Sequence, residues 1–96
     1  MKLVSVKPAT DGKHKYTAQF LQDNGRTKTT HFGAKGMDDY TLKGDKAQRE
    51  RYLSRHKARE NWNDPSTAAA LSRWLLWGDS TSFAQNLHAF RSRFGV

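Results

Sequence analysis

"HKYTAQFLQDNGRTKTTHF", residues 14–32, is the stretch that decides the fold class. Tyr16, Ala18 and Phe20 alternate with polar residues, so they would share one face of a β-strand. Asn24 and Gly25 tolerate the positive φ angles of a tight hairpin, and the Thr-rich residues 26–32 suit a returning strand. Residues 3–7, "LVSVK", alternate in the same way. We therefore predict a three-stranded antiparallel meander over about residues 1–33.

A glycine-containing loop (residues 34–44) and a helical part (residues 45–94) are predicted to follow the meander. The run "DKAQRERYLSRHKAREN", residues 45–61, has helical character, with Asp45 as a plausible N-cap. At 100° per residue, Tyr52, Leu53 and His56 form its buried stripe.

Two further helices are predicted after residue 61. Asp64 is the expected N-cap of the first, with Pro65 at the first helical position and Gly78 just past the end. Ser80 or Thr81 is the expected N-cap of the second. The predicted inward-facing residues of these two helices are Thr67, Leu71, Trp74, Leu75, Phe83, Leu87, Phe90 and Phe94.

The chain length of 96 residues suits one domain, residues 1–96, with one modest core. Three Trp, three Tyr and five Phe must supply much of the buried area, because hydrophobic residues make up only 35% of the chain. The predicted fold class is α+β, in which a short antiparallel meander of about three strands packs against three α-helices.

Cysteine is absent, which excludes disulfides and thiolate metal sites. No apolar stretch is long enough to span a bilayer, and the first residues lack the apolar core of a signal peptide. We expect a soluble, intracellular protein with no membrane partner and no cofactor.

The strong positive charge points to an anionic partner. The formal net charge is +8, from 17 Lys and Arg against nine Asp and Glu, and nucleic acid is the commonest partner of such a chain. Arg51, Arg55 and Arg59 follow one another at helical spacing, so their guanidinium groups could address successive phosphates. The alternative is an ordinary solvated face whose charge is compensated by Glu50 and Glu60.

A second basic surface is predicted near the hairpin. Lys13, Lys15, Arg26 and Lys28 would cluster there, where a β-ribbon could lie against a groove or a single strand. The alternative is that these side chains only protect the sheet edges from aggregation.

The loop "FGAKGMDDYT", residues 32–41, has two interpretations. Backbone N–H groups near Gly33 and Gly36 could bind one anion with help from Lys35, although the spacing matches no known nucleotide-binding motif. In the other interpretation, the loop is a structural corner in which Asp38 and Asp39 hydrogen-bond to its own backbone.

A metal-dependent nuclease is the most specific enzyme hypothesis, and it is less favoured than a function in binding. His31, Asp38, Asp39, His56 and Glu60 supply plausible bases and metal ligands, but their spacing fits no metal motif. We predict no catalytic residues and no metal site, and therefore a protein that is not an enzyme.

The three tryptophans are interpreted mainly as packing residues. Trp74 lies on a predicted inward stripe, and Trp62 is expected to anchor a turn on the core. Trp77 is expected to be exposed, where it could form an apolar contact patch with Phe94.

Three segments carry a resemblance to known sequences: "HFGAKGMDDYT" (31–41), "YLSRHKARENWNDPSTAAALSRWLLW" (52–77) and "RSRF" (91–94). From about Tyr16 to Phe94 the chain resembles a family of small uncharacterised proteins of giant double-stranded DNA viruses and of some algae and protists. The resemblance implies a virus-related setting, in the host cell nucleus or cytoplasm or in the virion, and no mechanism.

The prediction drawn from the residues is a small basic protein that binds DNA or RNA without catalysis and with little sequence specificity. Its contacts would come from the two basic surfaces and Lys35. The alternative is a virion-associated structural or interaction protein that uses the same surface against an acidic protein.

Overall fold

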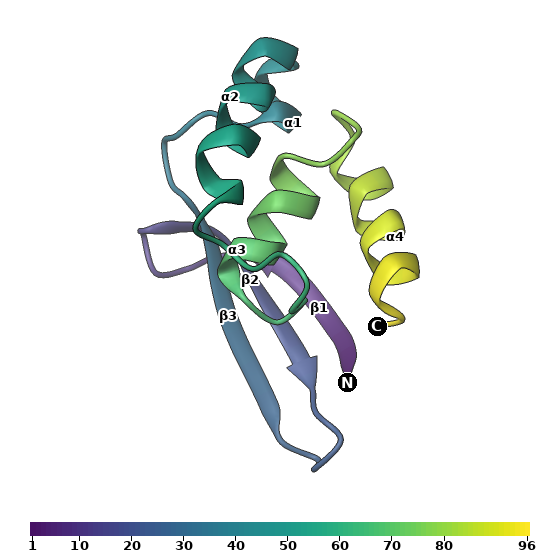
Figure 1. The fold of residues 1–96 in the computed structure, drawn as a ribbon. Helices are drawn as coiled ribbons and strands as arrows, with labels where there is room; N and C mark the ends of the chain where they lie inside the picture. The colour runs from purple at the N-terminus through teal and green to yellow at the C-terminus, as the bar shows by residue number, and fades with distance from the viewer.

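A computed structural model describes all residues from Met1 to Val96 and confirms the α+β class (Figure 1). The sheet has three antiparallel strands in the order β1-β2-β3, as predicted. The strands are β1 (Lys2–Pro8), β2 (His14–Leu21) and β3 (Thr27–Ala34). The helical part comprises α1 (Tyr40–Lys43), α2 (Lys46–Lys57), α3 (Ala68–Leu71), the π-helical turn η1 (Ser72–Leu76) and α4 (Phe83–Phe94).

The β2–β3 hairpin closes with a short turn, as the sequence predicts. The N–H of Gly25 donates to the Gln22 carbonyl at 2.9 Å, and the N–H of Gln22 donates to the Arg26 carbonyl at 2.8 Å. Gly25 has a φ of 83°, whereas no residue other than glycine has a positive φ. These features describe a turn of three residues closed by a bulge.

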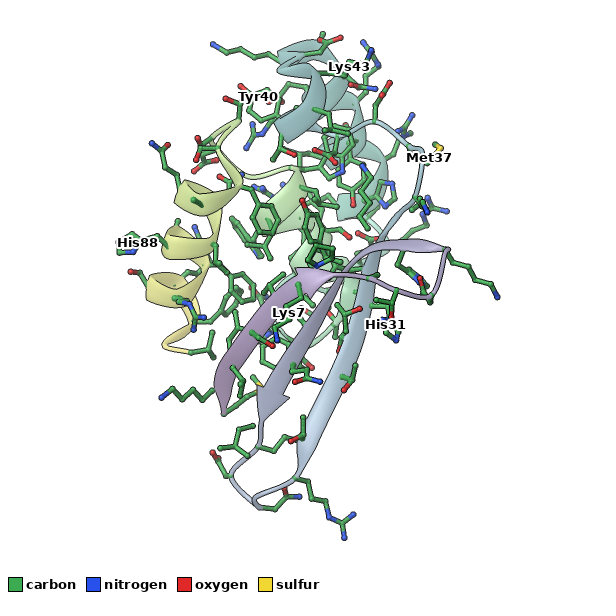
Figure 2. All side chains as sticks on the ribbon, turned by 180° about the vertical axis from the view of Figure 1, so that it is seen from behind. Lys7, His31, Met37, Tyr40, Lys43 and His88 are labelled. Atoms are coloured by element: carbon green, nitrogen blue, oxygen red, sulfur yellow. The ribbon has the colours of Figure 1, made fainter.

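The sheet has one covered face and one open face. The fully buried core includes Phe20 and Phe32 from the covered face, Leu71 and Leu75 from the helical segment that follows residue 67, and Phe90 from α4. The view from behind shows the sheet in front of the helices, with Lys7 and His31 on the side that no helix covers (Figure 2). The helical layer therefore lies on one side only.

The predicted start of the second long helix is wrong. The Asp64 carboxylate accepts from the N–H and the hydroxyl of Ser66 at 3.0 and 2.8 Å, which folds the chain into a turn around Pro65. The N-cap is Thr67, whose hydroxyl accepts from the Ala70 N–H. Helical spacing predicts that Thr67 faces the core, but in the structure its side chain caps the helix.

The π-turn overturns the prediction that Trp77 is exposed. The Trp77 N–H donates to the carbonyl of Ser72, five residues earlier, at 3.0 Å. The extra residue in this turn rotates Leu76 and Trp77 toward the core, where they are 2% and 7% exposed. A regular 3.6-residue period would not place both side chains there.

The chain after the π-turn is held by a buried amide. The side-chain amide of Asn86 donates to the carbonyls of Leu75 and Ser80, and its oxygen accepts from the Ser80 N–H. Gly78 is not the left-handed residue that the sequence suggested, since its φ is not positive. Glycine is needed at this position because the backbone packs closely against Trp74: a Cβ on Gly78 would lie 2.4 Å from the Trp74 carbonyl oxygen. The N-cap of α4 is Ser82, later than the predicted Ser80 or Thr81.

Candidate functional site

A cleft of about 460 Å³ lies between the β3–α1 loop and α2. The end of β3 contributes Gly33, the loop contributes Gly36 and Asp38, and α2 contributes Arg55 and His56. A second hollow of about 500 Å³ lies between the end of the π-turn and α4, and it contains none of the predicted binding residues. The first cleft is therefore the candidate site.

The β3–α1 loop has the character of a structural corner. The N–H of Lys35 donates to the Lys13 carbonyl at 3.0 Å, and the N–H of Met37 donates to the Ala34 carbonyl at 3.2 Å. Gly33 has a φ of 75°, and a Cβ there would lie 2.8 Å from a methyl carbon of Leu76. Two of the N–H groups that an anion nest would need are thus already bonded, which favours the structural interpretation of this loop.

The floor of the cleft holds a buried ion pair. Lys15 Nζ donates to Asp39 Oδ2 at 2.5 Å, and the two side chains are 12% and 2% exposed. The other oxygen of Asp39 accepts from the N–H and the hydroxyl of Thr41, which caps α1. Lys15 therefore offers no free charge to a ligand, contrary to the sequence prediction, because a buried carboxylate holds it.

An aromatic column runs from the core to the cleft. Trp77 stacks on Tyr52 with ring centroids 4.2 Å apart, and Tyr52 stacks on His56 at 4.1 Å. The predicted inner stripe of α2 is thus only half-buried, since Tyr52, Leu53 and His56 lie between the core and the cleft. Burial, with the charge of Glu60 adding to it, raises the pKa of Tyr52 to about 12. Tyr52 therefore stays neutral at physiological pH.

Glu60 fixes the outer ring of this column. Its Oε2 lies 2.8 Å from His56 Nδ1, and its Oε1 accepts from Trp62 Nε1 at 3.0 Å. Burial acts to raise the pKa of Glu60, but the hydrogen bonds from His56 and Trp62, with nearby positive charge from Arg59, hold it below its ordinary value. Glu60 is therefore a charged group committed to His56 and Trp62.

The arginine row remains without carboxylate partners. Arg51, Arg55 and Arg59 are all exposed and form no salt bridge. The two carboxylates that could have compensated them are used elsewhere: Glu50 lies 3.4 Å from Arg49, and Glu60 pairs with a histidine. Arg55 also lines the cleft.

The helix is shorter than predicted, and this changes the row at one end. The α2 helix ends at Lys57 with Ala58 as C-cap, whereas the sequence suggested helix to residue 61. Arg59 lies in the following turn, where its N–H donates to the His56 carbonyl at 3.1 Å. Arg51 and Arg55 therefore keep helical spacing, and Arg59 continues the row from a turn.

The four basic residues of the hairpin region do not form one cluster. Lys13 is exposed and lies beside exposed Lys35, at the cleft end of the sheet. Arg26 lies at the opposite end, in the β2–β3 turn, and Lys28 Nζ donates to the Ser66 hydroxyl at 2.8 Å. β2 spans eight residues between these ends, which separates them by roughly 25 Å. Of the exposed cations in this region, Arg55 lines the cleft, and the others lie on segments next to its lining residues. We call this set the cationic rim: Lys13, Lys35, Arg51, Arg55 and Arg59.

The five residues of the nuclease hypothesis do not converge. His31 lies on the open face of the sheet, where its ring stacks on His14 and its Nδ1 lies 2.8 Å from the Thr17 hydroxyl. No group of three or more His, Asp or Glu side chains is arranged to hold a metal ion. Asp38 and Asp39 share the cleft with His56, but Asp39 is already neutralised by the buried lysine.

Sequence reasoning missed the aromatic column. Helical periodicity predicts that Tyr52 and His56 lie on a packing stripe and that Trp77 is exposed. The periodicity of one helix does not show which rings of another helix it contacts. The rings of Tyr52, His56 and Trp77 line one cleft together with Ser72 and Leu76. This arrangement depends on the π-turn.

These features define a small α+β protein with a basic cleft beside an antiparallel sheet. The chain belongs to a family of unknown function, DUF5754, whose model matches residues 4–56. The matched segment contains the sheet, the β3–α1 loop and α2 up to His56, and thus four of the five rim residues. Searches of curated proteins and of solved structures each found no match. None of the helices is both long and apolar enough to cross a bilayer.

Proposed function

We propose that the protein binds nucleic acid by phosphate contacts from the cationic rim. The observation that carries this proposal is the absence of carboxylate partners for Arg51, Arg55 and Arg59. Two other basic side chains nearby are paired: Lys15 meets a buried carboxylate, and Arg49 Nη2 lies 2.9 Å from Asp79. The unpaired cations are therefore available to an external anion.

Arginine suits phosphate in geometry as well as charge. Its planar guanidinium group can form two parallel hydrogen bonds to one phosphate, and Arg51 and Arg55 lie one helical turn apart. Lys13 and Lys35 add point charges from the sheet side of the cleft. Such contacts position a strand without reading its bases, so we expect affinity with little sequence specificity.

The experiment is fluorescence anisotropy with labelled duplex DNA, single-stranded DNA and single-stranded RNA over a salt series. If each of the five rim cations meets one phosphate, the slope of log K against log salt for a single strand is about −3 to −4. The variant with Arg51, Arg55 and Arg59 all changed to Glu is expected to abolish binding at moderate salt. No binding by the parent protein to any of the three nucleic acids at low salt would refute the proposal.

A matched control separates local contacts from general charge. The variant with Lys2, Lys7 and Arg26 all changed to Glu has the same change in net charge, and these exposed residues lie on β1 and in the far turn. We expect it to keep most of the affinity of the parent. Equal losses in both triple variants would show that only the overall field matters, and the rim would lose its special role.

The alternative function, a structural or interaction protein that binds an acidic protein, has less support. The apolar patch expected around Trp77 and Phe94 is missing, because Trp77 is buried and Phe94 is half-buried. The same anisotropy series distinguishes the two, since a shape-specific protein contact depends less on salt than a phosphate contact.

The proposed setting is a virus-infected cell, with the protein in the host nucleus or cytoplasm or in the particle. Its support is the resemblance of residues 31–41 and 52–77 to proteins of giant double-stranded DNA viruses. Immunoblotting of fractionated infected cells and purified particles tests it, and absence of the protein from all these fractions would refute it.

A further inference from the structure

The aromatic column ends at His56, in the cleft. The rings of Trp77 and Tyr52 are inclined by 7°, and those of Tyr52 and His56 by 23°. Trp77 is buried in the core, whereas the His56 side chain is 28% exposed and lines the cleft. No further ring of the protein stacks on His56. The column thus stops at a partly exposed aromatic surface.

His56 is held in a fixed orientation. Its Nδ1 lies 2.8 Å from Glu60, and Glu60 is in turn held by the Trp62 indole N–H at 3.0 Å. The only buried side-chain nitrogen or oxygen without a partner is Arg73 Nε, so the unpartnered Nε2 of His56 is open to solvent. A ring that is stacked on one side and hydrogen-bonded at one edge loses little further freedom when a ligand binds.

We propose that the cleft binds one unpaired nucleobase, which stacks on His56 and extends the column by one ring. The proposal rests on the proposed function, because the phosphates flanking that base would lie on Arg55 and Lys35. Arg55 lines the cleft, and Lys35 lies between Ala34, the last residue of β3, and Gly36, both of which line it. The cleft volume of about 460 Å³ falls within the usual range of small-ligand sites, about 300–1,000 Å³.

The inferred ligand is therefore single-stranded nucleic acid. A base in a duplex has both faces covered by its neighbours, whereas a base in a single strand can turn out and stack on a side chain. The Asp38 carboxylate at the cleft wall offers one hydrogen-bond acceptor to the edge of the stacked base.

The test uses two single strands of 12 nucleotides that carry the same phosphates. One is oligothymidine, and the other consists of abasic residues, so they differ only in the bases. We expect the parent protein to bind the base-containing strand about tenfold more tightly, and to bind a 12-base-pair duplex no better than the abasic strand. His56→Ala should remove most of this preference while leaving abasic binding unchanged.

Two variants serve as controls. His56→Phe keeps an aromatic face on the column and should retain the preference for bases. His88→Ala removes an exposed histidine on α4, on the far side of the molecule from Met37 and the cleft loop (Figure 2), and should behave as the parent.

The outcomes distinguish this inference from the proposed function. Equal affinity of the parent for the two strands would overturn the base site and leave phosphate binding intact, whereas binding to neither strand would overturn the proposed function. Because His56→Ala could also loosen α2, a strand with 5-iodouracil should be photocrosslinked to the unaltered protein. Crosslinks to cleft residues are expected, and crosslinks only to His31 on the open face of the sheet would overturn the site.

Discussion

Lys15→Met tests whether the ion pair at the cleft floor holds the loop, α1 and the sheet together. Methionine is close to lysine in length and retains its apolar stem, so the substitution mainly removes the charge. The Asp39 carboxylate, whose side chain is 2% exposed, then has no cation. It keeps only the two hydrogen bonds from Thr41.

The expected loss of stability is large for a domain of this size. Removing one partner of a buried pair costs about 3–5 kcal/mol, and the 12% exposure of Lys15 favours the lower end, about 3 kcal/mol. The total free energy of unfolding of a native domain is about 5–15 kcal/mol. For a domain of 60–100 residues, this corresponds to a fall in melting temperature of about 12–24 °C.

The measurement is urea unfolding of the parent and three variants, followed by tryptophan fluorescence. Lys13→Met is the matched control, since Lys13 is an exposed lysine with no side-chain partner, and it should change the free energy of unfolding by less than about 0.5 kcal/mol. Asp39→Asn added to Lys15→Met removes the stranded charge and keeps an N-cap residue, so it should recover more than half of the loss. A loss below about 1 kcal/mol for Lys15→Met would refute the reasoning, because the carboxylate would then not depend on the lysine.

Three further predictions concern the buried turn and the Glu60 network. Gly78→Ala should lower the free energy of unfolding by at least about 2 kcal/mol, because its Cβ would lie 2.4 Å from the Trp74 carbonyl oxygen; thermal unfolding within 3 °C of the parent would contradict this. Asn86→Ala should cost about 2–4 kcal/mol in urea unfolding, because it leaves one buried and two partly buried backbone groups without partners, and a cost below about 1 kcal/mol would show that water replaces the amide. Glu60→Gln should destabilise at pH 7 and cease to do so in acid. A carboxyl with a lowered pKa stabilises the fold above its unfolded value, ordinarily 4.5, and that contribution is lost as pH falls through the lower folded value. Unfolding of both proteins from pH 7 to pH 3 checks this, and a difference that does not change with pH would count against the network.

Local patterns predicted the parts of the fold that depend on neighbours in sequence. The alternation around Tyr16 and Phe20 fixed the strands, and the predicted N-cap Asp45 accepts from the Gln48 N–H at 3.1 Å. The start of α3 was missed because Asp64 and Pro65 suit a turn as well as a helix N-terminus, and only the hydrogen bonds to Ser66 decide between them.

The site was harder to predict because it depends on distant partners. Lys15 resembles any exposed strand lysine until Asp39, 24 residues later, is brought beside it. The arginine row acquires its significance from the pairing of Glu50 and Glu60 with other residues; helical spacing places both carboxylates off the row, but the bonds that they form are seen only in the structure. The sequence thus identified the charged residues, whereas only the structure shows which of them are free of salt bridges.

The π-turn also bears on how related sequences should be aligned. A relative with the same number of residues between Leu71 and Gly78 but a regular α-helix there would have every later side chain rotated by about 100°. A tryptophan at the aligned position of Trp77 would then no longer meet the ring on α2, even if both residues were identical. A relative that lacks one residue in this segment can instead form a regular helix and keep Trp77 facing α2, so a one-residue gap here is compatible with the aromatic column.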